Sequence, residues 1–262
     1  MAKQTPEELW HGMLTGEVRG LQRVRRFMLR IPSEPRCKLC AAPFGRPGKR
    51  FVRLVGFGPS TLNRRLCRGC IRSIQKKPGG AEIDLSVLFA DVRGSTALAE
   101  RLSPHEFSEL MARFYGTAAR VVDRSDGIVD KFVGDEVMAL YIPGFSGEDH
   151  AARAVAAARE LLEATGNDED DAWISLGAGV HTGVAYVGTV GEGDARDFTA
   201  LGDPVNIAAR LASAAGAGEL VVSSATASAA GLDTAALEPR LLEVRGRDEK
   251  VDAWVAAGRR PG

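Results

Sequence analysis

The sequence predicts an α+β fold, a sheet with packed helices, preceded by a small metal-binding domain. Two observations predict this division. Residues 1–80 hold 18 Lys and Arg against 4 Asp and Glu, whereas residues 81–262 hold 16 against 30. All four cysteines of the 262-residue chain also lie in the first part. Halves that differ this much are typical of separate domains, and the Lys-Pro-Gly-Gly stretch ending at Gly80 is typical of a linker.

The overall composition excludes several classes of protein. The chain is 45% hydrophobic and 26% charged, which is incompatible with disorder throughout. It contains no apolar run of 18 residues, so we expect no transmembrane segment. No apolar segment follows the first charges, so we expect no signal peptide. A cytoplasmic protein is therefore expected, in which disulfide bonds are rare.

Residues 1–36 are predicted to be a basic helical segment, with one helix over residues 6–30. Thr5 and Glu8 have the spacing of a capping box, and Pro6 occupies the first helical position. From Val18 to Arg30, arginines alternate with Leu, Val, Phe and Met, the pattern of a basic amphipathic helix. We expect its apolar side to dock on the neighbouring domain. Binding to an anionic surface, either a membrane or a nucleic acid, is the alternative.

Residues 37–77 contain two Cys-x-x-Cys pairs, Cys37 with Cys40 and Cys67 with Cys70, separated by 26 residues. Each pair places two thiolates on one tight turn, and two such turns close a tetrahedral sulfur site. The spacing resembles that of a zinc ribbon. We expect one structural zinc ion, with iron or an iron–sulfur cluster as the alternative. The intervening loop has little apolar core, so the metal would be needed for folding.

Residues 81–256 are predicted to form a single further domain. Its expected elements are a strand at 84–91, a helix at 103–123, hairpin strands at 128–132 and 137–142, a helix at 148–165, paired strands at 173–181 and 185–190, a helix at 203–214 and a strand at 219–223. The order β-α-β-β-α-β, with additions, is typical of a ferredoxin-like, polymerase-palm-type sheet with helices on one face.

Two carboxylates are expected to meet in this domain. Asp91 ends the first strand, and Asp135 lies in the turn of the hairpin. In a β-α-β-β sheet the first strand lies beside that hairpin, so both side chains reach one edge. Carboxylate oxygens suit Mg²⁺ or Mn²⁺ and the phosphates of a substrate. The turn from Val92 to Thr96, which enters a helix, offers backbone N–H groups to a polyphosphate.

Three segments carry a resemblance to a known family: Phe-Ala-Asp-Val-Arg-Gly-Ser-Thr at 89–96, Lys-Phe-Val-Gly-Asp at 131–135, and Phe-Thr-Ala-Leu-Gly-Asp-Pro-Val-Asn-Ile-Ala-Ala-Arg-Leu at 198–211. In this order and spacing they resemble the metal motifs and transition-state segment of class III nucleotidyl cyclases, over about residues 84–256. The resemblance implies that Asp91 and Asp135 bind two Mg²⁺ or Mn²⁺ ions, with the backbone carbonyl of Val92 as a further ligand.

The resemblance also implies the residues that bind substrate. Lys131 matches the lysine that reads the purine, and an ammonium donates well to adenine N1. Thr199 matches its partner; a hydroxyl both donates and accepts, so Thr199 fits adenine without strongly excluding guanine. Asn206 matches the residue that orients the ribose. Arg210, four positions later on the same helix face, matches the one that stabilises charge on the α-phosphate.

Two further positions complete the expected site. Arg245 or Arg247 lies where the family has a lysine that contacts the terminal phosphates, and the sequence does not decide between them. His181, inside a predicted buried strand, is expected to be structural rather than a catalytic base.

These residues predict an adenylate cyclase, which converts ATP to 3′,5′-cyclic AMP and pyrophosphate. The resemblance implies a homodimer in which the metal carboxylates of one protomer face the Asn and Arg of the other. A guanylate cyclase of the same family is one alternative. The other is a non-catalytic regulator that binds nucleic acid or a protein partner and carries a silent cyclase domain. Diguanylate cyclases share the sheet and a Gly-Asp-Glu sequence, but lack the helix with Asn206 and Arg210.

Overall fold

The computed structural model describes residues 5–33, 35–46, 57–59, 66–70, 72, 79–167, 172–192, 197–242 and 250–257. The chain forms two compact units. The sheet unit contains Asp84–Ile142, Ser146–Ala185 and Leu201–Gly262. The N-terminal unit contains Met1–Ile83, Pro143–Phe145 and Tyr186–Ala200. Two stretches distant in sequence from residues 1–83 thus belong to the same unit, which the charge division did not predict.

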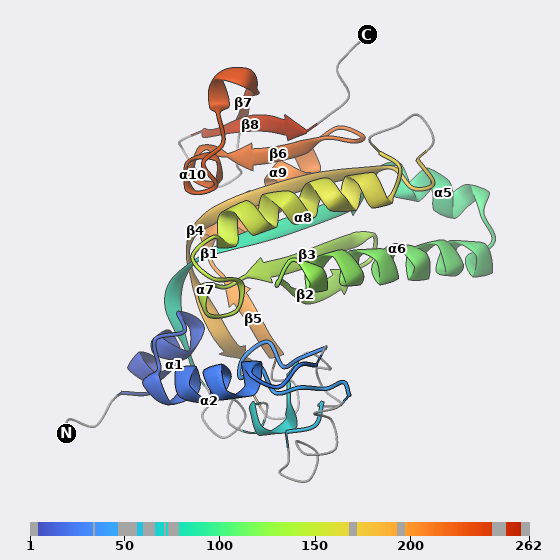
Figure 1. Ribbon diagram of the computed structural model, residues 1–262. Helices are drawn as coiled ribbons and strands as arrows, with labels where there is room; N and C mark the ends of the chain where they lie inside the picture. The colour runs from blue at the N-terminus through green and yellow to red at the C-terminus, as the bar shows by residue number, and fades with distance from the viewer. Residues whose placement is uncertain are drawn as a thin grey trace. The chain divides into compact units, whose positions relative to one another are not determined.

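Eight strands form one mixed sheet (Figure 1). The strands are β1 (Gly80–Val92), β2 (Ile128–Val133), β3 (Glu136–Tyr141), β4 (Leu176–Val190), β5 (Asp197–Leu201), β6 (Leu220–Ser223), β7 (Glu238–Leu242) and β8 (Val251–Ala257). Their order is β2-β3-β1-β4-β6-β8-β7, with β5 paired to β4. The series β4-β1-β3-β2, with the long helix α6 (Pro104–Arg124) between β1 and β2 and the long helix α8 (His150–Ala164) between β3 and β4, confirms the predicted β-α-β-β-α-β arrangement.

The long helices α6 and α8 pack on one face of this sheet. Ser103 caps α6 by accepting from the Glu106 backbone, in a capping box that the sequence pattern predicts. The core beneath the two helices includes Phe114 and Leu161, both with 1% or less of their surface exposed. Because alternate strand residues point to opposite faces, Leu220 joins this core and Val221 does not.

The helix α9 (Asp203–Ala214) packs on the opposite face, where Ile207 and Leu211 contact Val221. The expectation of helices on one face was therefore incomplete. Gly179 of β4 permits the close approach of α9, since a Cβ atom there would lie 2.2 Å from the backbone nitrogen of Ala212. The close packing of α9 on β4 thus depends on the absence of a side chain at Gly179.

The remaining helices are short: α1 (Pro6–Leu14), α2 (Arg19–Leu29), α5 (Ser95–Arg101), α7 (Pro143–Ser146), α10 (Ser224–Ala229) and the 3₁₀ helix η2 (Thr234–Ala236). The single helix expected at 6–30 is two, because Gly16 adopts a left-handed conformation (φ 80°) between them. Among the helices that the structure describes, none has the combined length and apolarity to cross a membrane.

The two strands expected at 173–181 and 185–190 are one continuous strand, β4. Gly183, which lies between the two expected strands, remains extended within β4. Strand β5, which the sequence did not predict, pairs with β4.

Candidate functional site

Asp91 and Asp135 lie together at the end of β1. Asp91 is paired with Glu136 across the antiparallel β1–β3 ladder, and Asp135 occupies the turn just before β3. The backbone N–H of Val92 donates to the carbonyl oxygen of Asp135 at 3.2 Å, which joins the strand end to the turn. The sequence therefore predicted this meeting of carboxylates, and the register of the ladder explains it.

The electrostatics of this group favour a bound cation. Burial raises the pKa of Asp91; nearby Asp135 raises it further, while Arg93 lowers it. Burial also raises the pKa of Glu136, with the charges of Asp91 and Asp135 adding to the effect. A divalent cation would relieve the repulsion among these acids and hold them ionised. Carboxylate oxygens are donors that suit Mg²⁺ or Mn²⁺, so the chemistry of this group fits the predicted ions.

Tyr115 of α6 contacts the turn that carries Asp135. The hydroxyl of Tyr115 donates to the carbonyl oxygen of Gly134, and its ring stacks on Phe132, with the centroids 4.4 Å apart. A cavity of about 670 Å³ opens beside this turn. Its walls include Ser95 and Thr96, at the start of α5, together with Asp135. Asp135, one of the two predicted metal ligands, thus lines the same cavity as the first residues of α5, which belong to the turn expected to receive phosphates.

Lys131 lies in β2, at a register shift that follows Val129. Its Nζ atom is 3.2 Å from a carboxylate oxygen of Asp130, and its side chain is partly exposed. Thr199 belongs to the N-terminal unit. It is buried in β5, and its hydroxyl donates to the carbonyl oxygen of Ala200 at 3.5 Å. The purine-reading roles of Lys131 and Thr199 stay predictions.

Asn206 and Arg210 are both exposed on α9, one helical turn apart. Among the hydrogen bonds and ion pairs of the described residues, none joins either side chain to Asp91 or Asp135. One chain therefore holds two separate groups of predicted catalytic residues. Arg245 and Arg247 lie outside the described residues.

His181 is a buried residue of β4, and its Nδ1 lies 2.8 Å from the hydroxyl of Ser223. Ser223 in turn contacts Thr226, whose hydroxyl donates to the carbonyl oxygen of Val180 at 3.1 Å. This hydrogen-bonded position inside the sheet unit supports the structural role expected for His181.

Sequence reasoning missed two charged side chains beside Asp91, those of Arg93 and Glu136. Both are direct neighbours of predicted ligands, one position from Val92 and from Asp135. Strand alternation gives a usable signal for Glu136. As the first residue of β3 it points away from the buried Val137, toward the same side as Asp91. The ion pair of Arg93 with Asp91, at 3.2 Å, has no comparable sequence signal.

The four cysteines converge in the N-terminal unit. Their sulfur atoms all lie within 4.8 Å of one another, with Cys37 and Cys70 at 3.8 Å and Cys40 and Cys67 at 3.6 Å. Four sulfurs placed about 2.3 Å from a tetrahedral zinc are about 3.8 Å apart. Hydrogen bonds with the other thiols, Cys40 foremost, lower the pKa of Cys37. The cluster therefore has the geometry of a metal site, and the identity of its metal stays a prediction.

The helix α2 docks on the first cysteine turn of its own unit. Arg25 donates to the carbonyl oxygen of Lys38 at 2.7 Å, and Met28 packs against Ala41. Phe27, by contrast, is 55% exposed, and the neighbouring arginines at 23, 26 and 30 are exposed as well. An anionic surface as the partner of this face stays a prediction.

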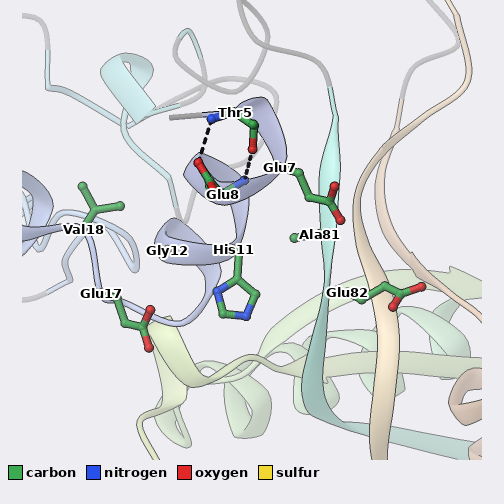
Figure 2. Close-up of a pocket in the computed structure, with 9 residues that line it drawn as sticks. All are labelled: Thr5, Glu7, Glu8, His11, Gly12, Glu17, Val18, Ala81 and Glu82. Carbon is green, nitrogen blue, oxygen red and sulfur yellow. Dashed lines mark hydrogen bonds between the residues drawn. The ribbon is translucent and has the colours of Figure 1, made fainter. Parts of the chain in front are cut away.

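The N-terminal unit also has an acidic cavity of about 760 Å³ between α1 and the start of β1 (Figure 2). Glu7 and Glu82 lie on its wall with His11, while Glu8 is engaged in the capping box with Thr5. It contains none of the predicted cyclase or cysteine residues.

Comparison with known proteins identifies the larger part of the chain. Residues 81–257 match the adenylate and guanylate cyclase catalytic domain. An adenylate cyclase of Anabaena cylindrica is 29% identical over 183 residues, which are 65% of this chain but only 36% of that protein. The crystal structure of the guanylyl cyclase Cya2 is 30% identical, with a TM-score of 0.60 over 70% of this chain and 96% of that one. The adenylyl cyclase CyaB of P. aeruginosa is 28% identical, with a TM-score of 0.58 over 69% and 97%. With three motifs in order, the predicted sheet and these matches, the chain belongs to the adenylate and guanylate cyclase family.

Proposed function

We propose that this protein is an adenylate cyclase that converts ATP to 3′,5′-cyclic AMP and pyrophosphate. The observation that carries the proposal is the meeting of Asp91 and Asp135 at the end of β1. Asp135 lines a cavity whose walls also include Ser95 and Thr96, the first residues of α5. Carboxylates of this kind have a direct use in phosphoryl chemistry, since they hold the cations that accompany a nucleoside triphosphate.

The residues divide the work of the reaction. The 3′-oxygen of ribose forms a bond to the α-phosphorus, the bond from that phosphorus to the pyrophosphate oxygen breaks, and the hydroxyl proton is released. Two divalent cations held by Asp91, Asp135 and the Val92 carbonyl would, when bound, acidify the hydroxyl and neutralise phosphate oxygens. Asn206 orients the ribose, and the guanidinium of Arg210 stabilises charge that develops at the α-phosphate. Arg245 or Arg247 is proposed to contact the terminal phosphates.

The choice of ATP rests on Lys131. Its ammonium is a donor only, so it suits adenine N1, which accepts, and not guanine N1, which carries a hydrogen. Guanylate cyclase activity is the second candidate. It is favoured by Thr199, whose hydroxyl accepts as well as donates, and by the likeness to the guanylyl cyclase Cya2. A silent domain is disfavoured by the presence of every expected ligand and catalytic side chain.

Product analysis tests this choice directly. The full-length protein is incubated with Mn²⁺ and either ATP or GTP, and cyclic products are identified by mass spectrometry. We expect cyclic AMP, and much slower turnover of GTP. Lys131→Glu should reduce the use of ATP more than it reduces Mn²⁺ binding, whereas Asp135→Ala should abolish both products and so assign them to this site. Equal rates with both nucleotides would contradict the assignment of ATP.

We propose a homodimer with two composite active sites, because Asn206 and Arg210 are exposed in one chain and, among the described residues, share no hydrogen bond or ion pair with Asp91 or Asp135. In a two-fold dimer, each α9 would meet the partner's carboxylates. Asn206→Ala and Asp135→Ala are each expected to be inactive. Mixing them gives heterodimers in which one site collects both defects and the other is native, so up to about half the native activity should return. Continued inactivity, with subunit exchange shown by fluorescence transfer between labelled chains, would contradict this architecture.

A further inference from the structure

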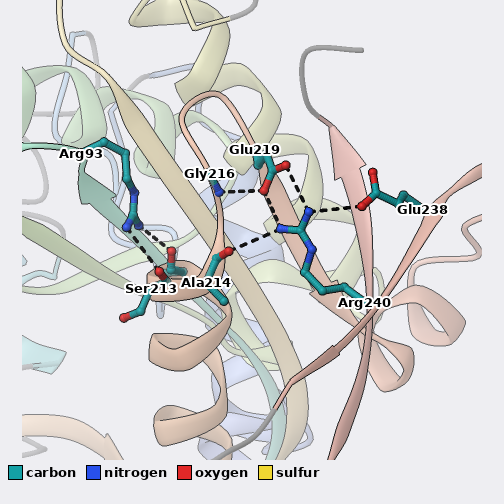
Figure 3. A network of polar contacts seen from close by, with 8 residues as sticks. Arg93, Ser213, Ala214, Gly216, Glu219, Glu238 and Arg240 are labelled. Carbon is teal, nitrogen blue, oxygen red and sulfur yellow. Dashed lines mark hydrogen bonds and ion pairs between the residues drawn. The ribbon is translucent and has the colours of Figure 1, made fainter. Parts of the chain in front are cut away.

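Arg93 connects the metal carboxylates to the carboxyl end of α9 within one chain. Its Nη2 atom lies 3.2 Å from a carboxylate oxygen of Asp91 and donates to the carbonyl oxygen of Ala212. Its Nη1 atom donates to the carbonyl oxygen of Ser213 at 3.4 Å. Figure 3 shows the guanidinium turned toward this end of the helix. The backbone of Arg93 is also fixed, since its N–H donates to Ser175 at 2.8 Å.

The residues around the Arg93 guanidinium provide both hydrogen-bond acceptors and space for it. The last carbonyl groups of a helix lack partners within the helix and carry partial negative charge. The last turn of α9 has no basic residue of its own, so Arg93 supplies the missing positive charge. Gly177 leaves the necessary room, because a Cβ atom there would lie 2.6 Å from Nε of Arg93. That Nε is buried and, among the described residues, has no hydrogen-bond acceptor, so the position is not optimised for stability alone.

We propose that Arg93 is a positioning residue that couples the two active sites of the dimer. The inference rests on the composite sites proposed above. In that architecture, Asp91 and α9 of one protomer serve different sites. Asp91 would hold a cation in one site, and the cation would then compete with Arg93 for the carboxylate. The guanidinium would be left to the carbonyls of α9 and would fix Asn206 and Arg210 for the other site.

The first test compares two arginines that end near the same helix terminus. Arg240 donates to the carbonyl oxygen of Ala214 at 3.3 Å and pairs with Glu219 and Glu238 (Figure 3). Its side chain is 24% exposed, against 23% for Arg93, but its described contacts include no metal carboxylate. We expect Arg93→Gln to lower kcat about tenfold or more and to change the Mn²⁺ dependence. Arg240→Gln should change neither, whatever it does to the thermal midpoint.

Arg93→Lys keeps the charge but loses the fork that reaches both partners, so it should return the Mn²⁺ dependence to that of the unmodified protein without recovering kcat. Gel filtration and thermal midpoints establish that each variant is a folded dimer. Equal kinetic effects of the changes at Arg93 and Arg240 would overturn the proposal, because helix stability alone would then explain both.

The decisive test uses the heterodimer of an Asn206→Ala chain, the first chain, with an Asp135→Ala chain, the second. It has one active site without a substitution. That site takes its carboxylates from the first chain and its α9 from the second. Arg93→Gln is placed in either chain. In the first chain it should lower the Mn²⁺ requirement, because the guanidinium that competes with the cation for Asp91 is gone; in the second it should lower kcat with the Mn²⁺ requirement unchanged. No effect from the second chain, with the reference heterodimer active, overturns the coupling and leaves the composite site intact. An inactive reference heterodimer overturns both.

Discussion

Asp91 and Glu136 are directly paired across the β1–β3 ladder, with Asp135 in the adjoining turn. Three acidic side chains therefore share a partly buried corner of the sheet unit, and Arg93 is the cation that the structure shows beside them. The charges of Asp91 and Asp135 help to raise the pKa of Glu136. We propose that the mutual repulsion of these acids helps them to attract a divalent cation.

We predict that Glu136→Gln weakens the binding of Mn²⁺ severalfold, because one of three negative charges is removed. The acid limb of the activity profile should move to lower pH, since Asp91 loses a negative neighbour and ionises more readily. Mn²⁺ titrations of activity at several pH values measure both effects. Glu109→Gln is the control: Glu109 is 70% exposed on α6 and pairs with His105. An unchanged Mn²⁺ requirement in Glu136→Gln would show that this carboxylate does not contribute to the metal site.

The sequence was sufficient to predict that Asp91 and Asp135 lie close together. Both are at the ends of strands, and the order of those strands follows from the β-α-β-β pattern. The sequence did not predict Arg93, since the carbonyls that Arg93 binds belong to a helix 120 positions away. Contacts of that kind depend on the angle and depth at which α9 packs, which no local pattern specifies. The alternation of side chains along a strand could have placed Glu136 beside Asp91. The expected strand began at residue 137, however, so Glu136 was assigned to the turn.

We predict that Gly179→Ala destabilises the sheet unit by about 1–3 kcal/mol or more. The added Cβ would lie 2.2 Å from the backbone nitrogen of Ala212 and 2.7 Å from the carbonyl oxygen of Ala208, so α9 would have to move off the strand. Gly116→Ala is the matched control. Gly116 lies inside α6, where the nearest atom to a new Cβ is 3.5 Å away, so the change should stabilise by about 0.5–1 kcal/mol. Urea unfolding of both variants tests the difference.

We predict that the thermal midpoint falls as the pH is lowered from about 7.5 to about 5.5. Burial lowers the pKa of His150, although Asp84 and Glu148 oppose the shift. Its Nδ1 lies 2.9 Å from the hydroxyl of Ser86. Because the folded state binds the proton more weakly than the unfolded state, protonation favours unfolding, and stability is lost on the acidic side.

His150→Gln should flatten this dependence. His105→Gln should leave it unchanged, since His105 is 83% exposed. A midpoint equally pH-dependent with and without His150 would assign the acid sensitivity to other groups.

The fold as a whole was easier to predict than its connections. Capped, periodic segments such as α6 gave clear signals, and α9 was predicted with its observed limits. Strand β5 was missed because its residues were interpreted only as part of a motif, and β7 and β8 because they follow the last motif. The break at Gly16 was missed because apolar periodicity continues on both sides of it. For the three strands tertiary pairing decided the outcome, whereas at Gly16 the left-handed backbone conformation did.

The last prediction concerns the four cysteines. We propose that they hold one zinc ion, so elemental analysis of protein purified without chelator should give about one zinc per chain.

Trp10 is buried in the N-terminal unit and stacks on Phe198, with ring centroids 6.3 Å apart. A variant that keeps Trp10 alone, with Trp173→Phe and Trp254→Phe, reports on that unit. Because metal binding there is coupled to folding, a strong chelator should shift its emission to longer wavelength, and Cys37→Ser should do the same without chelator. The matched variant that keeps only Trp254, in the sheet unit, should not respond. Iron in place of zinc would change the assignment of the metal. An unchanged Trp10 emission after complete metal removal would show that the cysteine site is not needed for folding, since the reporter lies in the same compact unit as the four sulfurs.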